Sequence, residues 1–152
     1  MPQPMLLGEL LVSKGLITPT QLQAALESQR TTKEFLGALL VRRGWLKEVA
    51  LLQTLAEQFE MPYITLAQET IDWQVAQRFS LALMMEHHCL PLRMTTKTVR
   101  VAIANPLDAW AISELEKAAN PRRVELCLAS ASDILAAIQQ FQQQAIKPTN
   151  RA

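Results

Sequence analysis

The sequence lacks the features that mark most membrane-spanning, exported or nucleic-acid-binding proteins. A formal net charge of +1 over 152 residues gives no electrostatic basis for binding a nucleic-acid polymer. No apolar run approaches roughly 18 residues, so we expect neither a transmembrane helix nor direct membrane insertion. The start of the chain has no basic segment ahead of an apolar stretch, which argues against a signal peptide. We therefore expect a cytoplasmic protein.

Motifs for catalysis and metal binding are also missing. The sequence contains neither the G-x-x-x-x-G-K-[ST] phosphate loop nor G-x-S-x-G, so ATP hydrolysis cannot reside in these residues. The one cluster of potential metal ligands, His87-His88-Cys89, points its neighbouring side chains in different directions, unlike spaced zinc ligands. The two cysteines, Cys89 and Cys127, lie in apolar runs and are predicted to be free structural thiols. We predict no catalytic residue, no metal and no cofactor.

What the sequence does contain is an internal repeat. Residues 6–29 and 35–58 align with a shift of 29 positions, and nine of the 24 aligned positions are identical. The identical pairs are Leu7/Leu36, Gly8/Gly37, Leu10/Leu39, Leu11/Leu40, Val12/Val41, Gly15/Gly44, Leu22/Leu51, Leu26/Leu55 and Gln29/Gln58. A repeat means one structural unit used twice, and two such units can enclose one ligand or partner with pseudo-twofold symmetry.

Each copy has the pattern of a helix, a tight turn and a second helix. Gly15 can end the first helix as its C-cap, and Thr18-Pro19-Thr20-Gln21 has the form of a capping box that starts the second. In the second copy Lys47 replaces Thr18, so that helix is predicted to lack a capping side chain. Because so small a hairpin cannot bury its own apolar face, the two copies are expected to pack on each other. Residues 1–59 are therefore predicted to be a helical subdomain.

The second part of the chain, residues 60–142, predicts a small β-β-α-β-α subdomain, which makes the fold class α+β. The expected elements are an extended segment at 62–66, helices at 71–79 and 81–87, a hairpin of strands at 89–94 and 99–103, a helix at 105–119, a strand at 123–128 and a helix through 142. Ser80, Asn105 and Ser130 are the predicted N-caps. Residues 143–152 are polar and are predicted to be a tail or linker.

The doubled motif resembles the N-terminal domain of type II secretion and type IV pilus assembly ATPases. Its best-known version is the cyclic di-GMP-binding MshEN domain, and the five-residue spacer from Arg30 to Glu34 preserves the register of that motif. The resemblance implies a non-catalytic regulatory and docking domain, with ATP hydrolysis in a C-terminal ATPase domain if the chain is part of a longer one. It also implies docking onto the cytoplasmic part of an inner-membrane platform protein, which would place the domain at the periphery of that membrane.

An alternative function implied by the resemblance is that of a cyclic di-GMP sensor, in a secretion ATPase or a membrane glycosyltransferase. The implied ligand-binding residues are Leu7, Gly8, Leu11, Gly15, Gln29, Arg30, Leu36, Gly37, Leu40, Gly44 and Gln58. The arginine that opens each motif is replaced here by Leu6 and Phe35, which removes a side chain suited to phosphate and guanine.

Each of these positions also has a structural interpretation. The leucines are expected to be core residues, Gly15 and Gly44 to be helix C-caps with positive φ, and Gly8 and Gly37 to allow either close packing or ligand approach. Apolar residues that a docking partner could contact are Trp73, Phe79, Met84, Met85 and Trp110, although a place in the core is the favoured interpretation of each.

Overall fold

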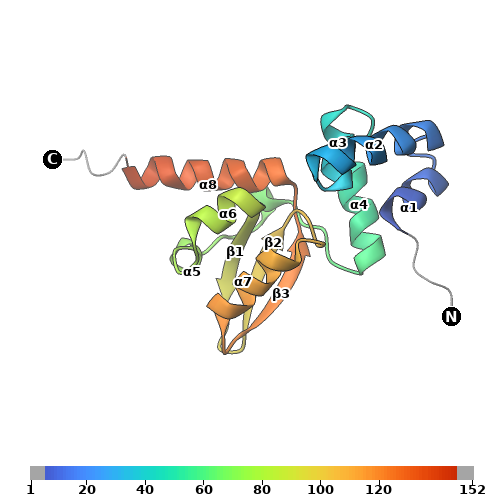
Figure 1. Cartoon of the computed structure of the whole chain (residues 1–152). Helices are drawn as coiled ribbons and strands as arrows, with labels where there is room; N and C mark the ends of the chain where they lie inside the picture. The colour runs from blue at the N-terminus through green and yellow to red at the C-terminus, as the bar shows by residue number, and fades with distance from the viewer. Residues whose placement is uncertain (1–5, 147–152) are drawn as a thin grey trace. The chain divides into compact units, whose positions relative to one another are not determined.

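The computed structural model describes residues 6–146 (Figure 1). The chain forms two compact units, the first ending at Glu60 and the second beginning at Met61. Within the described residues, no helix is both long enough and apolar enough to cross a bilayer.

The first unit consists of four helices that follow the sequence repeat. They are α1 (Leu7–Ser13), α2 (Pro19–Thr32), α3 (Leu36–Arg42) and α4 (Glu48–Phe59). The first copy supplies α1 and α2, and the second copy supplies α3 and α4. Helix α1 packs against α4 as well as α2, and α3 packs against α2 as well as α4. The two copies therefore cover each other's apolar faces, as predicted for hairpins of this size.

The turn between the helices is the same in both copies. Gly15 has φ +74° and Gly44 has φ +78°, the left-handed conformation that glycine adopts without steric cost. The amide of Gly15 donates to Val12 O at 2.9 Å, and the amide of Gly44 donates to Val41 O at the same distance. Because a Cβ atom at either glycine would meet nothing within 4 Å, it is the backbone conformation and not a lack of space that requires glycine.

The second helix of each copy starts as the sequence predicts. The Thr18 hydroxyl accepts a hydrogen bond from Gln21 N at 3.1 Å, and the Gln21 side chain accepts one from Thr18 N at 3.0 Å. This capping box is complete, whereas Lys47 provides no side-chain cap to α4. An ion pair of 2.7 Å between Lys14 and Glu57 links the end of α1 to α4.

The second unit is a three-stranded mixed sheet with helices packed against its two outer strands (Figure 1). Strand β1 (Cys89–Met94) pairs antiparallel with β2 (Thr98–Ile103), and β2 pairs in parallel with β3 (Arg123–Leu128), so the order is β1-β2-β3. The remaining elements are η1 (Leu66–Gln68), α5 (Trp73–Ala76), α6 (Leu81–His87), α7 (Ala109–Ala119) and α8 (Ala131–Ile146). The predicted α+β class and β-β-α-β-α order are confirmed.

The core of this unit lies between the sheet and its helices. Val99, Val101 and Ile103 of β2 are buried, and Pro91 lies on the edge strand β1. Helix α7 packs against β3, while α5, α6 and α8 pack against β1. Cys89 and Cys127 are free and buried, and burial, assisted by the Asp108 carboxylate, raises the pKa of the Cys89 thiol to about 12.

Three predicted boundaries in this unit are wrong. Helix α5 is a single turn at 73–76 and does not extend over 71–79. The N-cap of α7 is Asp108, whose Oδ1 accepts from Ala111 N at 3.1 Å, whereas Asn105 accepts from Leu107 N in the turn before the helix. Helix α8 continues to Ile146, beyond its predicted end at Gln142, and the rest of the predicted tail lies outside the described residues.

Candidate functional site

The leucines of the candidate ligand site form the core of the first unit. Leu11 and Leu40 are completely buried, and Leu7 and Leu36 are nearly so. Burying a leucine side chain contributes about 1.5–3 kcal/mol, so packing alone accounts for these residue types. The core interpretation of these four positions is therefore the one that the structure supports.

Gly8 and Gly37 are sites of close helix packing. A Cβ atom added at Gly8 would lie 2.5 Å from Leu22 Cδ1, and one added at Gly37 would lie 2.6 Å from Leu51 Cδ1. Each glycine thus lets the first helix of its copy approach a leucine of the second helix. The same Cβ position at Gly8 is 3.4 Å from Leu36 Cδ2, so the beginnings of the two motifs meet in space.

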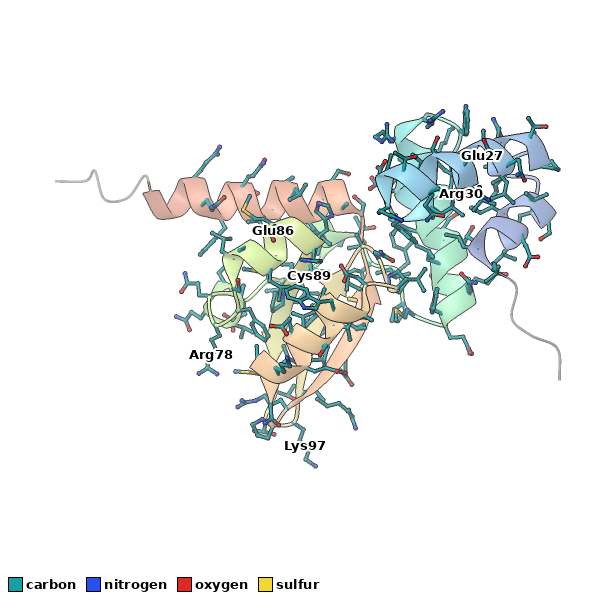
Figure 2. All side chains as sticks on the ribbon, viewed as in Figure 1. Glu27, Arg30, Arg78, Glu86, Cys89 and Lys97 are labelled. Atoms are coloured by element: carbon teal, nitrogen blue, oxygen red, sulfur yellow. The ribbon has the colours of Figure 1, made fainter. Side chains whose placement is uncertain are left out.

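The polar candidates are only partly available to a ligand. Gln29 donates from Nε2 to Glu34 O at 2.9 Å, which fastens the spacer to the end of α2. Gln58 is half-buried on α4, and Arg30 is exposed on α2, the helix that also carries Glu27 (Figure 2). Gly15 and Gly44 are exposed in the turns. Of the polar candidates, Arg30 offers the most accessible side chain.

Two arginines near the spacer, Arg42 and Arg43, already have partners. Arg42 forms a two-pronged ion pair with Glu34, with Nη2 at 2.6 Å and Nε at 3.2 Å from the carboxylate oxygens, and this hydrogen bonding lowers the pKa of Glu34. Arg43 donates to Ser28 Oγ at 2.7 Å, and its guanidinium lies 5.4 Å from the Trp45 ring centre. Neither Arg42 nor Arg43 therefore substitutes for the missing motif arginines.

The positions of the missing arginines are equivalent in the structure. Leu6 is the N-cap residue of α1 and Phe35 is the N-cap residue of α3. Leu6 is 72% exposed, while Phe35 is half-buried with its ring over Gly37. Apolar side chains therefore stand at both places where the family motif has a cation.

The first unit also has a cavity of about 400 Å³, which does not coincide with the candidate ligand site. It is lined by Lys14, Leu16, Ala50, Gln53, Thr54 and Glu57, and by none of the candidate residues. The structure thus brings the beginnings of the two motifs together at Gly8 and Leu36, whereas Gly15 and Gly44 are exposed in the turns and Arg30 is exposed on α2.

In the second unit, an exposed apolar patch is formed by Leu107 and Trp110 beside the start of α7. Leu107 is 52% exposed and the docking candidate Trp110 is 59% exposed, whereas the candidates Phe79 and Met84 are buried and Met85 is half-buried. Trp73 is half-buried and stacks on Phe141 at 4.4 Å between ring centres. Leu107 was not among the predicted docking residues: the predicted helix began at 105, whereas α7 begins at Ala109 and leaves Leu107 in the turn before it.

The Trp110 ring is held in place by the end of α6. It contacts the His87 ring at 4.9 Å, and His87 Nδ1 is 2.7 Å from Asp108 Oδ2. Asp108 also caps α7, so one carboxylate orients both the helix and the histidine. His87 therefore has a structural partner, and the described residues contain no group of three or more potential metal-binding side chains.

A helical repeat followed by a β-β-α-β-α unit is the architecture of the N-terminal domains of secretion and pilus-assembly ATPases. The chain belongs to the MshEN domain family, whose model matches residues 59–147. Among solved structures, it is similar to that of MshE with cdg, with a TM-score of 0.77 and 27% identity over 90% of this chain and 99% of that one. The N-terminal domain of XpsE shares the fold, with a TM-score of 0.76 and 23% identity over 92% of this chain and 98% of that one.

Two curated relatives are longer proteins. The chain is 33% identical over 112 residues to the type IV pilus assembly ATPase PilB of Thermus thermophilus, covering 72% of this chain and 13% of that protein. It is 28% identical over 135 residues to PilB of Myxococcus xanthus, covering 89% of this chain and 24% of that protein. The chain thus spans between about an eighth and a quarter of these relatives, and the resemblance inferred from the repeat is confirmed at the level of the family.

Proposed function

We propose that this domain docks a secretion or pilus-assembly ATPase onto the cytoplasmic part of an inner-membrane platform protein. The observation that carries the proposal is the exposed apolar patch of Leu107 and Trp110. Family membership and the similarity to two pilus assembly ATPases support the setting. The domain would bind at the membrane through a protein partner and would itself carry out no catalytic step.

The patch has the properties of a protein-binding hot spot. Tryptophan is enriched at such sites, where one large ring can contribute much of the binding free energy. The contact with His87 and the pairing of His87 with Asp108 restrict the Trp110 ring before any partner binds. A side chain that is already ordered loses less conformational entropy on association, which favours binding.

The substitution Trp110→Ala is expected to weaken binding to the platform protein's cytoplasmic domain by about 30-fold or more, because losing a hot spot costs about 2 kcal/mol or more. Binding is measured by titration calorimetry with the purified cytoplasmic domain from the same organism. Val49→Ala, which truncates an exposed apolar residue of the first unit, is the control and should leave affinity unchanged. Equal affinity for Trp110→Ala and the unaltered chain, with both folded, would remove this patch from the docking surface.

A second function, binding of cyclic di-GMP, is favoured by the similarity to the structure of MshE with cdg, which we take to be that nucleotide. The meeting of the two motifs at Gly8 and Leu36 supports a site at their junction. We expect saturable binding, weaker than that of a chain with both motif arginines. Titration calorimetry at moderate salt tests this, with cyclic di-AMP as the control for a ligand without guanine. Absence of heat at high micromolar ligand, from folded protein, would leave docking alone.

A further inference from the structure

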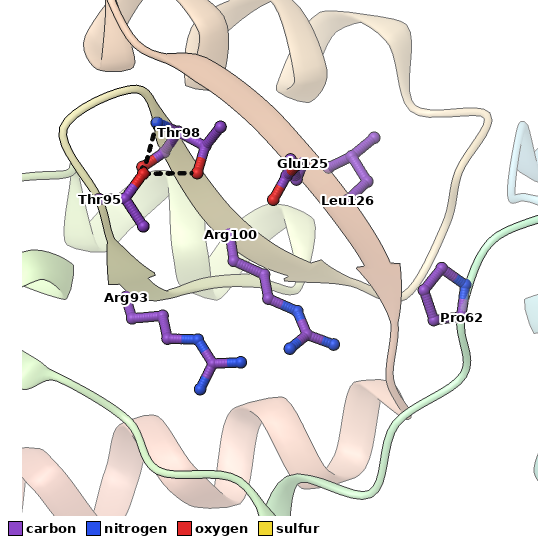
Figure 3. A pocket seen from close by; sticks show the side chains of 7 residues that line it. All are labelled: Pro62, Arg93, Thr95, Thr98, Arg100, Glu125 and Leu126. Carbon is purple, nitrogen blue, oxygen red and sulfur yellow. Dashed lines mark hydrogen bonds between the residues drawn. The ribbon is translucent and has the colours of Figure 1, made fainter.

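We propose that the second unit binds an oxyanion, a phosphate or carboxylate group, in an open cavity on one face of the sheet. The cavity has a volume of about 460 Å³, and its lining includes Arg93, Thr95, Thr98, Arg100 and Glu125 (Figure 3). None of its lining residues belongs to the apolar patch at Leu107 and Trp110 or to the repeated helices. The site and the docking function can therefore be tested independently.

The pairing of the strands places two arginines side by side. Arg93 of β1 faces Arg100 of β2 in the antiparallel register, after an irregularity between Pro91 and Arg93. Side chains at facing positions are about 5 Å apart at Cβ, and like charges there are destabilising. Both guanidinium groups extend into the cavity from neighbouring strands (Figure 3). An anion between them would convert this repulsion into two attractive contacts.

Neither guanidinium has its hydrogen-bonding capacity filled. The Arg100 side chain is 27% exposed and forms one long ion pair, with Glu69 Oε1 at 3.7 Å from Nη1, which is beyond hydrogen-bond distance. Among the residues that the structure describes, no carboxylate lies within ion-pair distance of Arg93. Each guanidinium offers five N–H donors in a planar fork that matches the two oxygens of a carboxylate or phosphate edge.

At one end of the cavity lies the turn between β1 and β2, which is rigid and carries basic side chains nearby. The Thr95 hydroxyl accepts from Thr98 N at 2.9 Å and from Lys97 N at 3.2 Å, which fixes the hairpin loop. Arg122 donates from Nε to Thr95 O at 2.9 Å, and Lys97 extends from the free end of the hairpin (Figure 2). These nearby cations raise the local positive potential and so favour an anionic ligand.

Glu125 acts against an anion in the same cavity. It faces Arg100 in the parallel register of β2 and β3, is exposed and lines the cavity. Its negative charge repels an incoming oxyanion while leaving the arginine donors in place. A neutral side chain of the same shape at this position should therefore increase affinity, a result that disruption of the fold would not produce.

The experiment is an NMR titration of the folded chain, with inorganic phosphate in one arm and the dicarboxylate glutarate in the other, at ionic strength held constant with chloride. Saturable shifts are expected at the Nε–Hε signals of Arg93 and Arg100. Arg93→Gln and Arg100→Gln should each weaken binding about tenfold or more, because hydrogen bonds to charged groups are removed. Glu125→Gln should strengthen it several-fold. Tighter binding in the phosphate arm indicates a phosphorylated ligand, and tighter binding of glutarate indicates acidic side chains.

The matched control is Arg123→Gln, which removes an exposed cation from the same sheet without touching the cavity lining. We expect this variant to bind like the unaltered chain. An equal loss in Arg123→Gln and Arg93→Gln would show a diffuse basic surface and overturn the proposed site. Shifts that grow linearly without saturation in both arms would overturn it as well.

Discussion

Replacing both Leu6 and Phe35 with arginine is expected to strengthen binding of cyclic di-GMP by about 30-fold to more than ten-thousand-fold. The range follows from about 1–3 kcal/mol for each bidentate arginine–guanine pair, taken as additive over two. The two residues occupy equivalent N-cap positions on α1 and α3, one in each copy. Leu6 is exposed, so an arginine there can extend without displacing the core. At Phe35, the change also removes the ring that lies over Gly37.

The comparison is made by titration calorimetry on four chains: unaltered, Leu6→Arg, Phe35→Arg and the double variant. A control with Gln23→Arg and Val49→Arg adds the same charge at exposed positions of the same unit. If the control binds as tightly as the double variant, the gain comes from net charge and not from the motif. If no variant binds more tightly than the unaltered chain, the junction of the two copies is not a nucleotide site.

Local features of the fold could be predicted because each depends on a few neighbouring residues. The capping box of Thr18 and Gln21 forms within one helical turn, and the missing cap at Lys47 is seen directly in the sequence. The left-handed glycines at 15 and 44 follow from the need to end a helix and reverse the chain. The repeat then predicts the same turn at the same offset in the second copy, as the matching glycines show.

Features that depend on distant residues were predicted less well. The choice of Asp108 over Asn105 as the cap of α7 is coupled to a hydrogen bond with His87, which lies 21 residues earlier. Helix α5 shortens to one turn where Trp73 stacks on Phe141 of α8. Neither contact has a periodic signal in the sequence.

The candidate site, too, combines features that the sequence predicts with features that only the structure shows. The sequence identified the motif positions, but only the 2.5 Å approach of Leu22 to a Cβ atom at Gly8 shows that packing requires this glycine. The pair Arg93 and Arg100 was not predicted as a site, because its geometry depends on the register irregularity after Pro91. A simple hairpin pattern does not specify where such an irregularity falls.

Because the two copies have equivalent leucines, the same substitution in each copy can measure how differently the two copies are packed. Leu26 and Leu55 are equivalent in sequence, yet Leu26 is 38% exposed and Leu55 is completely buried. Leu55→Ala is expected to lower the free energy of unfolding by about 2–5 kcal/mol, because it removes buried methyl groups and leaves a cavity. Leu26→Ala should cost less, about 1–2 kcal/mol, because solvent already reaches part of its side chain.

Both variants are compared by urea unfolding of the whole chain, followed by far-ultraviolet circular dichroism. Since the two substitutions are chemically identical, the difference between them measures burial alone. A loss of similar size in both would mean that the two copies are packed symmetrically, against the structure. A large loss confined to Leu55→Ala would establish that Leu55 of α4 serves the core, while α2 keeps a partly exposed apolar side chain at the equivalent position.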